Sequence, residues 1–190
     1  MDAHKLQLKL FAETKGPVAL EVFIPVFHRW IKDGLVTGDT LVDVANYAHV
    51  PQGPGVVLIG HGADYFMDEG EGRLGLLYSR KRAEPPPGER LTDAFRNTVK
   101  AARLLESDPA LAGLKLRTDE WLLRSNDRLR APNTDETFAA IRPQLDAFCK
   151  KLFPDTAVEL TRVGTPRTLF SVKITTRPGP SLAMLGERLG

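Results

Sequence analysis

Residues 91–125, LTDAFRNTVKAARLLESDPALAGLKLRTDEWLLRS, decide the fold class. The first part places apolar residues at helical spacing, which predicts an amphipathic helix over 91–105. Residues 114–117 then alternate apolar and charged side chains, which predicts a strand. The residues TDE at 118–120 indicate a turn, and the alternation returns at 121–125 as a second strand. A helix followed by two short strands is typical of a mixed α+β protein.

The segments on either side of this stretch add further strands and helices. Similar patterns predict strands at 6–10, 40–48, 56–61, 74–80, 158–160 and 170–174, and helices at 22–34 and 138–152. From the strand at 74–80 to the strand at 158–160, the order is β-α-β-β-α-β, which is the ferredoxin-like order. We therefore predict an α+β fold with two layers, in which helices cover one face of a mainly antiparallel sheet.

A proline-rich spacer, PPPG at residues 85–88, is the one break in composition. It predicts an N-terminal β-α-β-β-β half at 1–84 and a C-terminal α-β-β-α-β-β half at 85–190. We expect the two halves to form one compact unit with a continuous sheet. The tail at 175–190 is predicted to be a loosely docked segment.

Composition and charge limit the classes of partner. The 26 basic and 24 acidic side chains give a net charge of +2, so no nucleic-acid partner is predicted. The single cysteine, Cys149, excludes a disulfide within the chain and a thiolate zinc site. The sequence has no signal-peptide pattern and no apolar run near the roughly 18 residues that span a membrane. We therefore expect a cytoplasmic protein with no membrane partner.

A second stretch, DVANYAHVPQGPGVVLIGHGADYFMD at residues 43–68, gathers the candidate functional residues. Side chains alternate between the two faces of a strand, so Asp43, Tyr47 and His49 are predicted to line one face. The valines between them are expected to anchor the other face in the core. His61 ends the next apolar strand between two glycines, which leave its imidazole accessible.

The turn between these strands supplies candidate ligand contacts. Gly53 and Gly55 have backbone amides that can orient an anionic group, although they fit no phosphate-binding motif. Tyr47 is a candidate polar member of the same site, and Tyr65 and Tyr78 are its candidate walls. A tight connection between strands is the alternative interpretation of the glycines.

Three interpretations of the histidines and aspartates remain open. His49 and His61 with an aspartate would suit zinc or iron, but the spacing fits no metal-binding motif. General acid–base catalysis would use either histidine, oriented by Asp43 or by Asp64, which shares a side with His61 if residues 63–68 form a helical turn. In the structural interpretation, the same groups bond to the backbone at strand ends and turns. Whether the protein holds a cofactor or a metal ion therefore stays open.

A basic segment lies at the end of the predicted strand at 74–80. Ser79 with Arg80, Lys81 and Arg82 could hold an anionic ligand at this strand end, although a solvated strand end is the preferred interpretation.

Two functions from different classes follow. The first is a small-molecule-binding protein or enzyme with a His/Asp/Tyr site around residues 43–68, for which proton transfer on an anionic metabolite is the candidate reaction. The alternative is a non-catalytic homo-oligomer, such as a homodimer, in which the histidine and glycine loop is structural. A pocket that contains both His49 and His61 would favour the first function.

Overall fold

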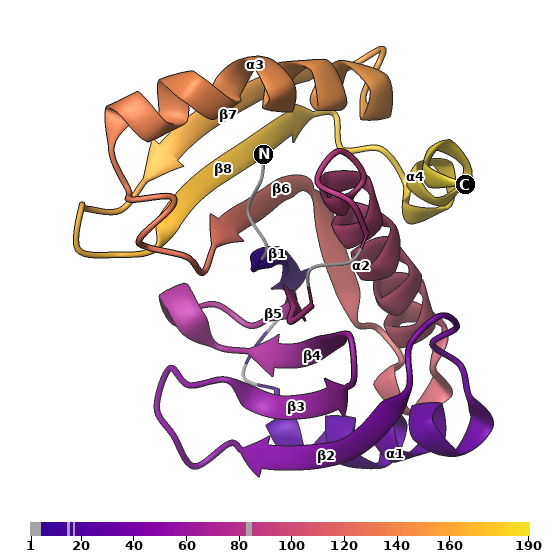
Figure 1. The fold of residues 1–190 in the computed structure, drawn as a ribbon. Helices are drawn as coiled ribbons and strands as arrows, with labels where there is room; N and C mark the ends of the chain where they lie inside the picture. Colours follow the sequence, from indigo (N-terminus) through magenta and orange to yellow (C-terminus); the bar gives the residue numbers. More distant parts are fainter. Residues whose placement is uncertain (1–4, 15, 17, 83–84) are drawn as a thin grey trace.

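The computed structural model describes residues 5–14, 16, 18–82 and 85–190, which form a mixed α+β fold (Figure 1). The helices are α1 (Phe23–Asp33), α2 (Arg90–Ser107), α3 (Asp135–Leu152) and α4 (Leu182–Leu189), with short 3-10 helices η1 (Leu20–Val22), η2 (Gly70–Gly72) and η3 (Pro109–Leu111). The strands are β1 (Leu6–Glu13), β2 (Leu41–Tyr47), β3 (Gly55–Gly60), β4 (Ala63–Asp68), β5 (Gly75–Arg80), β6 (Lys115–Ser125), β7 (Ala157–Val163) and β8 (Phe170–Arg177). Within the described residues, these eight strands form one antiparallel sheet in the order β2-β3-β4-β5-β1-β6-β8-β7. The predicted α+β class with an antiparallel sheet is confirmed.

Strand β1 lies inside the sheet because every second residue of its first half is a leucine. Leu6, Leu8 and Leu10 are fully buried, and their face of the sheet belongs to one core cluster with side chains from all four helices. Helix α2 packs on β1 and β5, α1 on β2 and β3, and α3 on β7, while α4 packs on α2. Figure 1 shows α2 running beside the middle of the sheet, between the outer strands β2 and β7. This position brings α2 to the ends of the central strands.

Strands from both halves of the chain share this sheet. Strand β1 pairs with β6, so the sheet is continuous across the predicted boundary. Residues 83 and 84, next to that boundary, lie outside the described residues, and the division into 1–84 and 85–190 stays a prediction.

The ferredoxin-like order is not confirmed, because the stretch predicted as two strands around a turn at 118–120 is one strand. β6 runs unbroken through these residues, and Glu120 pairs with Thr175 of β8. The irregularity falls on β6 itself, because its register with β1 passes from Leu10–Trp121 to Ala12–Leu116 and leaves residues 117–120 without a β1 partner. From β5 onward the order is therefore β-α-β-α-β-β, followed by α4.

Two further segments differ from the prediction. Residues 63–68 form strand β4 and not a helical turn, because they pair with both β3 and β5. The tail was predicted to be loosely docked, but it forms helix α4, capped by the Ser181 side chain. Leu185 is fully buried and Leu189 is 5% exposed, so the helix packs firmly through one face.

The predicted alternation along β2 is wrong at both ends. The β2–β3 register shifts between Leu41 and Asp43, and Val42 in this bulge is 61% exposed and does not anchor the strand. Val44 does pack against the core. His49 lies in the turn after the strand, so the strand alternation does not orient it.

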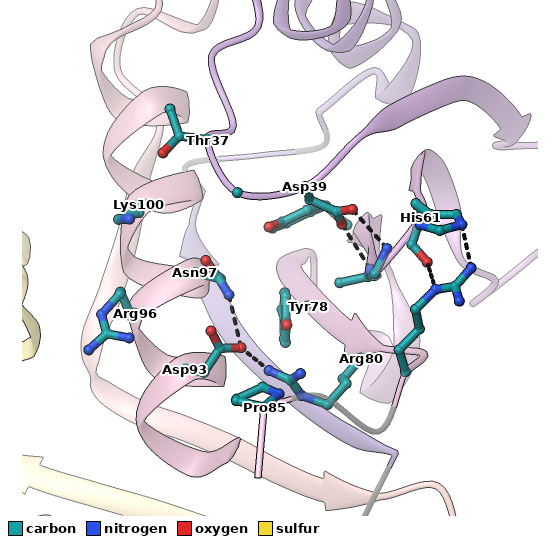
Figure 2. Close-up of a pocket in the computed structure, with 15 residues that line it drawn as sticks. Thr37, Asp39, His61, Tyr78, Arg80, Pro85, Asp93, Arg96, Asn97 and Lys100 are labelled. Atoms are coloured by element: carbon teal, nitrogen blue, oxygen red, sulfur yellow. Dashed lines mark hydrogen bonds and ion pairs between the residues drawn. The ribbon is translucent and has the colours of Figure 1, made fainter. Parts of the chain in front are cut away.

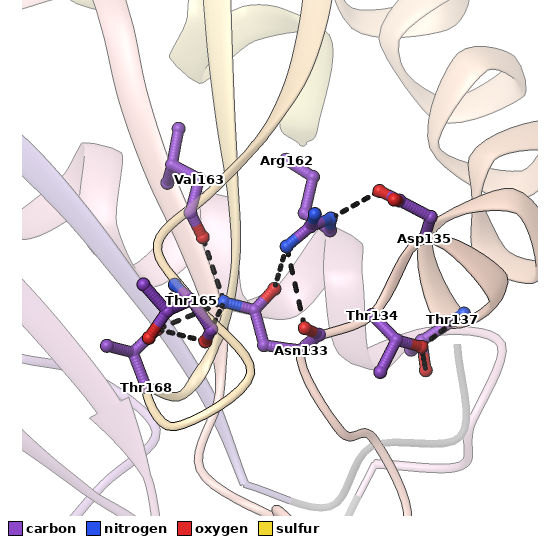
Figure 3. Close-up of polar contacts among 8 residues, drawn as sticks. All are labelled: Asn133, Thr134, Asp135, Thr137, Arg162, Val163, Thr165 and Thr168. Carbon is purple, nitrogen blue, oxygen red and sulfur yellow. Dashed lines mark hydrogen bonds and ion pairs between the residues drawn. The ribbon is translucent and has the colours of Figure 1, made fainter.

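A buried asparagine fastens the β7–β8 hairpin to the beginning of α3 (Figure 3). Asn133 is 1% exposed, and its Nδ2 donates to Val163 O at 2.9 Å, Thr165 O at 3.2 Å and Thr168 Oγ1 at 3.0 Å. Its Oδ1 accepts from Arg162 at 3.3 Å. One buried side chain thus joins three polar groups of the hairpin to the segment before α3.

Candidate ligand-binding site

A cavity of about 670 Å³ lies between the loop before β2, the ends of the central strands and α2 (Figure 2). Fifteen described residues line it, most of them polar or charged. They are Thr37, Gly38, Asp39, His61, Gly62, Ala63, Tyr65, Tyr78, Arg80, Arg82, Pro85, Asp93, Arg96, Asn97 and Lys100. A polar cavity of this size suits a small hydrophilic ligand.

Two tyrosines from neighbouring strands form the deepest part of the lining. Tyr65 on β4 pairs with Tyr78 on β5, and their rings meet edge to face with centroids 5.4 Å apart. Burial raises the pKa of both phenols, and in Tyr78 the Arg80 charge and a hydrogen bond with Asn97 act in the opposite direction. Both phenols therefore stay protonated at neutral pH and can donate hydrogen bonds.

An ion pair joins the strand wall of the cavity to α2. The guanidinium of Arg80, at the end of β5, pairs with Asp93 in the first turn of α2. Asn97 Nδ2 also donates to Asp93 Oδ2 at 3.1 Å. Burial lowers the pKa of Arg80, but its ordinary value is so high that the group stays charged near neutrality. The cavity therefore keeps a fixed positive group in its wall.

Asp39 closes the opposite side by binding backbone amides. Its Oδ1 accepts from Gly62 N at 2.8 Å and from Thr40 N at 2.8 Å, and its Oδ2 accepts from Ala63 N at 2.9 Å. This carboxylate holds the β3–β4 turn against the loop before β2, so its charge is largely compensated within the protein.

Three more cations lie around the cavity. Arg82 donates from Nε to the His61 carbonyl at 3.0 Å and also contacts the His61 ring. Arg96 of α2 donates to Leu189 O at 2.8 Å. Lys100 lies one helical turn further, is exposed, and has no carboxylate within ion-pairing distance among the described residues. These groups give the cavity an excess of positive charge.

The structure brings three of the predicted site residues, His61, Tyr65 and Tyr78, into this cavity. It places His49 elsewhere, since Tyr47 pairs with Gly55 at one end of β3 and His61 follows its other end. The two histidines are therefore separated by the length of the strand, roughly 17 Å. They do not share a cavity.

The remaining predicted residues have contacts that serve the hairpins. Asp43 is exposed and accepts from Val44 N at 2.7 Å, and Asp64 pairs with Lys81 at 2.7 Å. Tyr47 is 45% exposed, and its ring centroid lies 6.4 Å from that of His49.

The two candidate glycines belong to the turn between β2 and β3. The carbonyl of Gly53 accepts from Glu69 N at 3.2 Å. Gly55 has φ +62°, and a Cβ atom there would lie 2.0 Å from Met67 O. The close approach of the Met67 backbone and the left-handed conformation therefore explain why position 55 is a glycine.

The sequence reasoning missed most of the cationic lining. Arg80 and Arg82 were considered as an anion site, but the solvated strand end was preferred. Asp93, Arg96 and Lys100 follow one side of α2 at spacings of three and four residues, and this spacing was the available signal.

No family model and no curated protein sequence matches this chain.

The described residues contain no group of three or more histidine, cysteine, aspartate or glutamate side chains placed to hold a metal ion. No helix in this part of the chain is both long and apolar enough to cross a membrane.

Proposed function

We propose that this protein binds a small anionic metabolite in the cavity between the central strands and α2. The supporting observation is the balance of charge, because four cationic side chains and two carboxylates are among the described lining residues. Asp39 is bound by three backbone amides and Asp93 by Arg80 and Asn97, so neither carboxylate compensates Lys100. A ligand carboxylate or phosphate would supply the missing negative charge.

The polar groups of the lining give the ligand a defined orientation. Lys100 and Arg96 lie on one side of the cavity and His61 on another (Figure 2). Arg82 donates to the His61 carbonyl, so an anion with two charged groups can contact cations on both sides. The phenols at the floor stay protonated and can donate to an uncharged oxygen of the same molecule. A dicarboxylate or a phosphorylated hydroxy compound fits this set of donors.

If the bound molecule reacts, His61 is the residue we assign to proton transfer. It has the single imidazole among the described lining residues, and imidazole is the side chain best suited to proton transfer near neutral pH. Arg82 contacts its ring and fixes its position. His49, Asp43 and Asp64 have no part in this proposal, since they lie outside the lining.

A thermal-shift screen tests the proposed binding. Phosphate, succinate and citrate should each raise the melting temperature of the wild-type protein more than matched neutral compounds at equal ionic strength. The Lys100→Gln variant should lose this response, and Lys150→Gln should keep it, because Lys150 is an exposed residue of α3 outside the cavity. Equal shifts in the two variants would count against the cavity as the binding site.

A second candidate function is self-association, supported by the outer strand β2. Val42 is 61% exposed and Tyr47 is 45% exposed on this strand, which pairs only with β3 among the described residues. We infer a two-layer arrangement whose uncovered sheet face and β2 edge are available to a second copy. Light scattering coupled to size-exclusion chromatography should then find a dimer that Val42→Lys converts to a monomer. A wild-type monomer at all concentrations would remove this candidate.

A further inference from the structure

The sheet face opposite the helices carries a second set of charged groups. Lys9 points to this face, since its partners across the sheet are Leu77 and Leu122, which lie outside the helix-side core cluster. Its side chain is fully buried, and its Nζ lies 2.5 Å from Asp68 Oδ2 and 3.1 Å from Glu71 Oε2. A buried ammonium at this position depends on nearby carboxylates.

Glu71 bridges Lys9 to a second cation. Its Oε1 pairs with Nη2 of Arg124, on β6, whose side chain is 13% exposed. No other carboxylate lies within ion-pairing distance of Arg124 among the described residues. If Glu71 moved away, Asp68 would still compensate Lys9, but Arg124 would lack a counter-charge in a largely buried position.

Glu71 lies in a backbone segment of unusual conformation. It lies in η2 with φ +60°, a left-handed conformation that is uncommon for a residue with a side chain. Gly70 and Gly72 flank it, and Gly72 also has a positive φ of 65°. The Glu71 side chain remains 39% exposed, so water can solvate it along a path out of the site. The Glu71 carboxylate therefore belongs to the most exposed side chain of the cluster.

A cavity of about 420 Å³ adjoins this cluster. Glu71 and Arg124 line it at one side, and the apolar side chains of Leu122, Val163 and Leu169 line the remainder with some polar groups. The cavity thus combines one buried cation with an apolar wall, which suits a molecule with a charged end and an apolar body.

We infer that Arg124 forms an anion-binding site on this face, which Glu71 occupies as an internal carboxylate. A small molecule with one carboxylate and a short apolar body displaces Glu71, pairs with Arg124 and places its apolar body in the adjoining cavity. This site is independent of the cavity beside α2, because the two lie on opposite faces of the sheet.

Octanoate binding, measured by isothermal titration calorimetry, tests this inference, with octanamide as the neutral control. The Glu71→Gln variant removes the competing charge and should bind octanoate at least about 10-fold more tightly than the wild type. The matched variant Glu69→Gln removes a neighbouring carboxylate that pairs with neither cation, and should bind like the wild type. Adding Arg124→Met to Glu71→Gln should abolish the gain.

The inference is overturned if Glu71→Gln gives no gain, if octanamide gains equally, or if Arg124→Met leaves the gain intact. Circular dichroism establishes that each variant is folded. If Glu71→Gln does not fold, Glu71→Asn carries the same expectation, because it also removes the charge and asparagine tolerates the positive φ at this position. The Lys100→Gln variant should bind octanoate as the wild type does, which separates this result from the ligand proposed for the other cavity.

Discussion

Replacing Lys9 by methionine tests how far the buried ion cluster stabilises the fold. Methionine is similar in length, so the variant removes the charge and its hydrogen bonds and leaves little cavity. Lys9 Nζ donates to Asp68 at 2.5 Å, Gly70 O at 2.8 Å and Glu71 at 3.1 Å. Its loss therefore leaves the Asp68 carboxylate, only 10% exposed, without its cation.

Breaking a buried ion pair by removing one partner costs about 3–5 kcal/mol. We expect the lower end, about 3 kcal/mol, for two reasons. Gly70 N still donates to Asp68 at 3.1 Å, and the Glu71 side chain is exposed enough to be solvated. Urea unfolding measures this difference from the midpoint and the slope of the transition.

A second variant separates the charge effect from packing. Asp68→Asn in the Lys9→Met background removes the uncompensated carboxylate, so the double variant should be more stable than Lys9→Met alone by about 1 kcal/mol or more. The reasoning is refuted if Lys9→Met costs less than about 1 kcal/mol, or if the effects of the two substitutions simply add.

Three further predictions concern single buried groups. Asn133→Ala should lower the free energy of unfolding by about 2–3 kcal/mol, because it removes three hydrogen bonds to the hairpin, and amide exchange should quicken first in the β7–β8 hairpin. Ser125→Ala should raise the free energy of unfolding by about 1 kcal/mol, and with it the melting temperature. The reason is that the Ser125 hydroxyl is buried with no hydrogen-bond partner in the described part of the chain. A loss of stability would disprove this. Burial, with a contribution from Asp146, raises the pKa of Cys149 to about 12, so folding favours the protonated thiol. The free energy of unfolding should then fall as the pH rises from about 8.5, the usual thiol value, towards that pKa, and Cys149→Ala should show a shallower decline in urea unfolding at pH 8–10.5.

Much of the fold was predictable where one sheet face or one helix side is strictly apolar. Leu6, Leu8 and Leu10 alternate with polar residues, and they form a fully buried strand face. The helix over 91–105 was confirmed as α2, with its apolar side in the core. In these elements the local pattern and the tertiary environment agree, so the sequence alone was sufficient.

The misassigned elements are those where local signals conflict with the sheet. Residues 118–120 resemble a turn because they are polar, and they do interrupt the pairing with β1, but β6 passes through them and Glu120 pairs with Thr175 of β8. Residues 63–68 are only six residues long, and their pairing with two neighbouring strands decides their conformation. Such pairing is a long-range effect that no local pattern reports.

The candidate site was partly predictable for the same reason. His61 follows a recognisable strand, so its position at a strand end could be inferred, and it does line the cavity. The relation of His61 to His49 depended on the hairpin register, which placed them at opposite ends of β3. The contribution of Lys100 depended on how α2 packs across β1 and β5.

The most direct test of the proposed function is a calorimetric titration of succinate into the wild-type protein. We expect saturable binding at low salt that weakens as ionic strength rises. Lys100→Gln should weaken it about 10-fold, equal to about 1.4 kcal/mol, while Lys150→Gln leaves it unchanged. Succinamide, which has the same carbon chain as succinate but no charge, should not bind. Equal affinities for succinate in the wild type and both variants, or equal binding of succinamide, would contradict an anion site in this cavity.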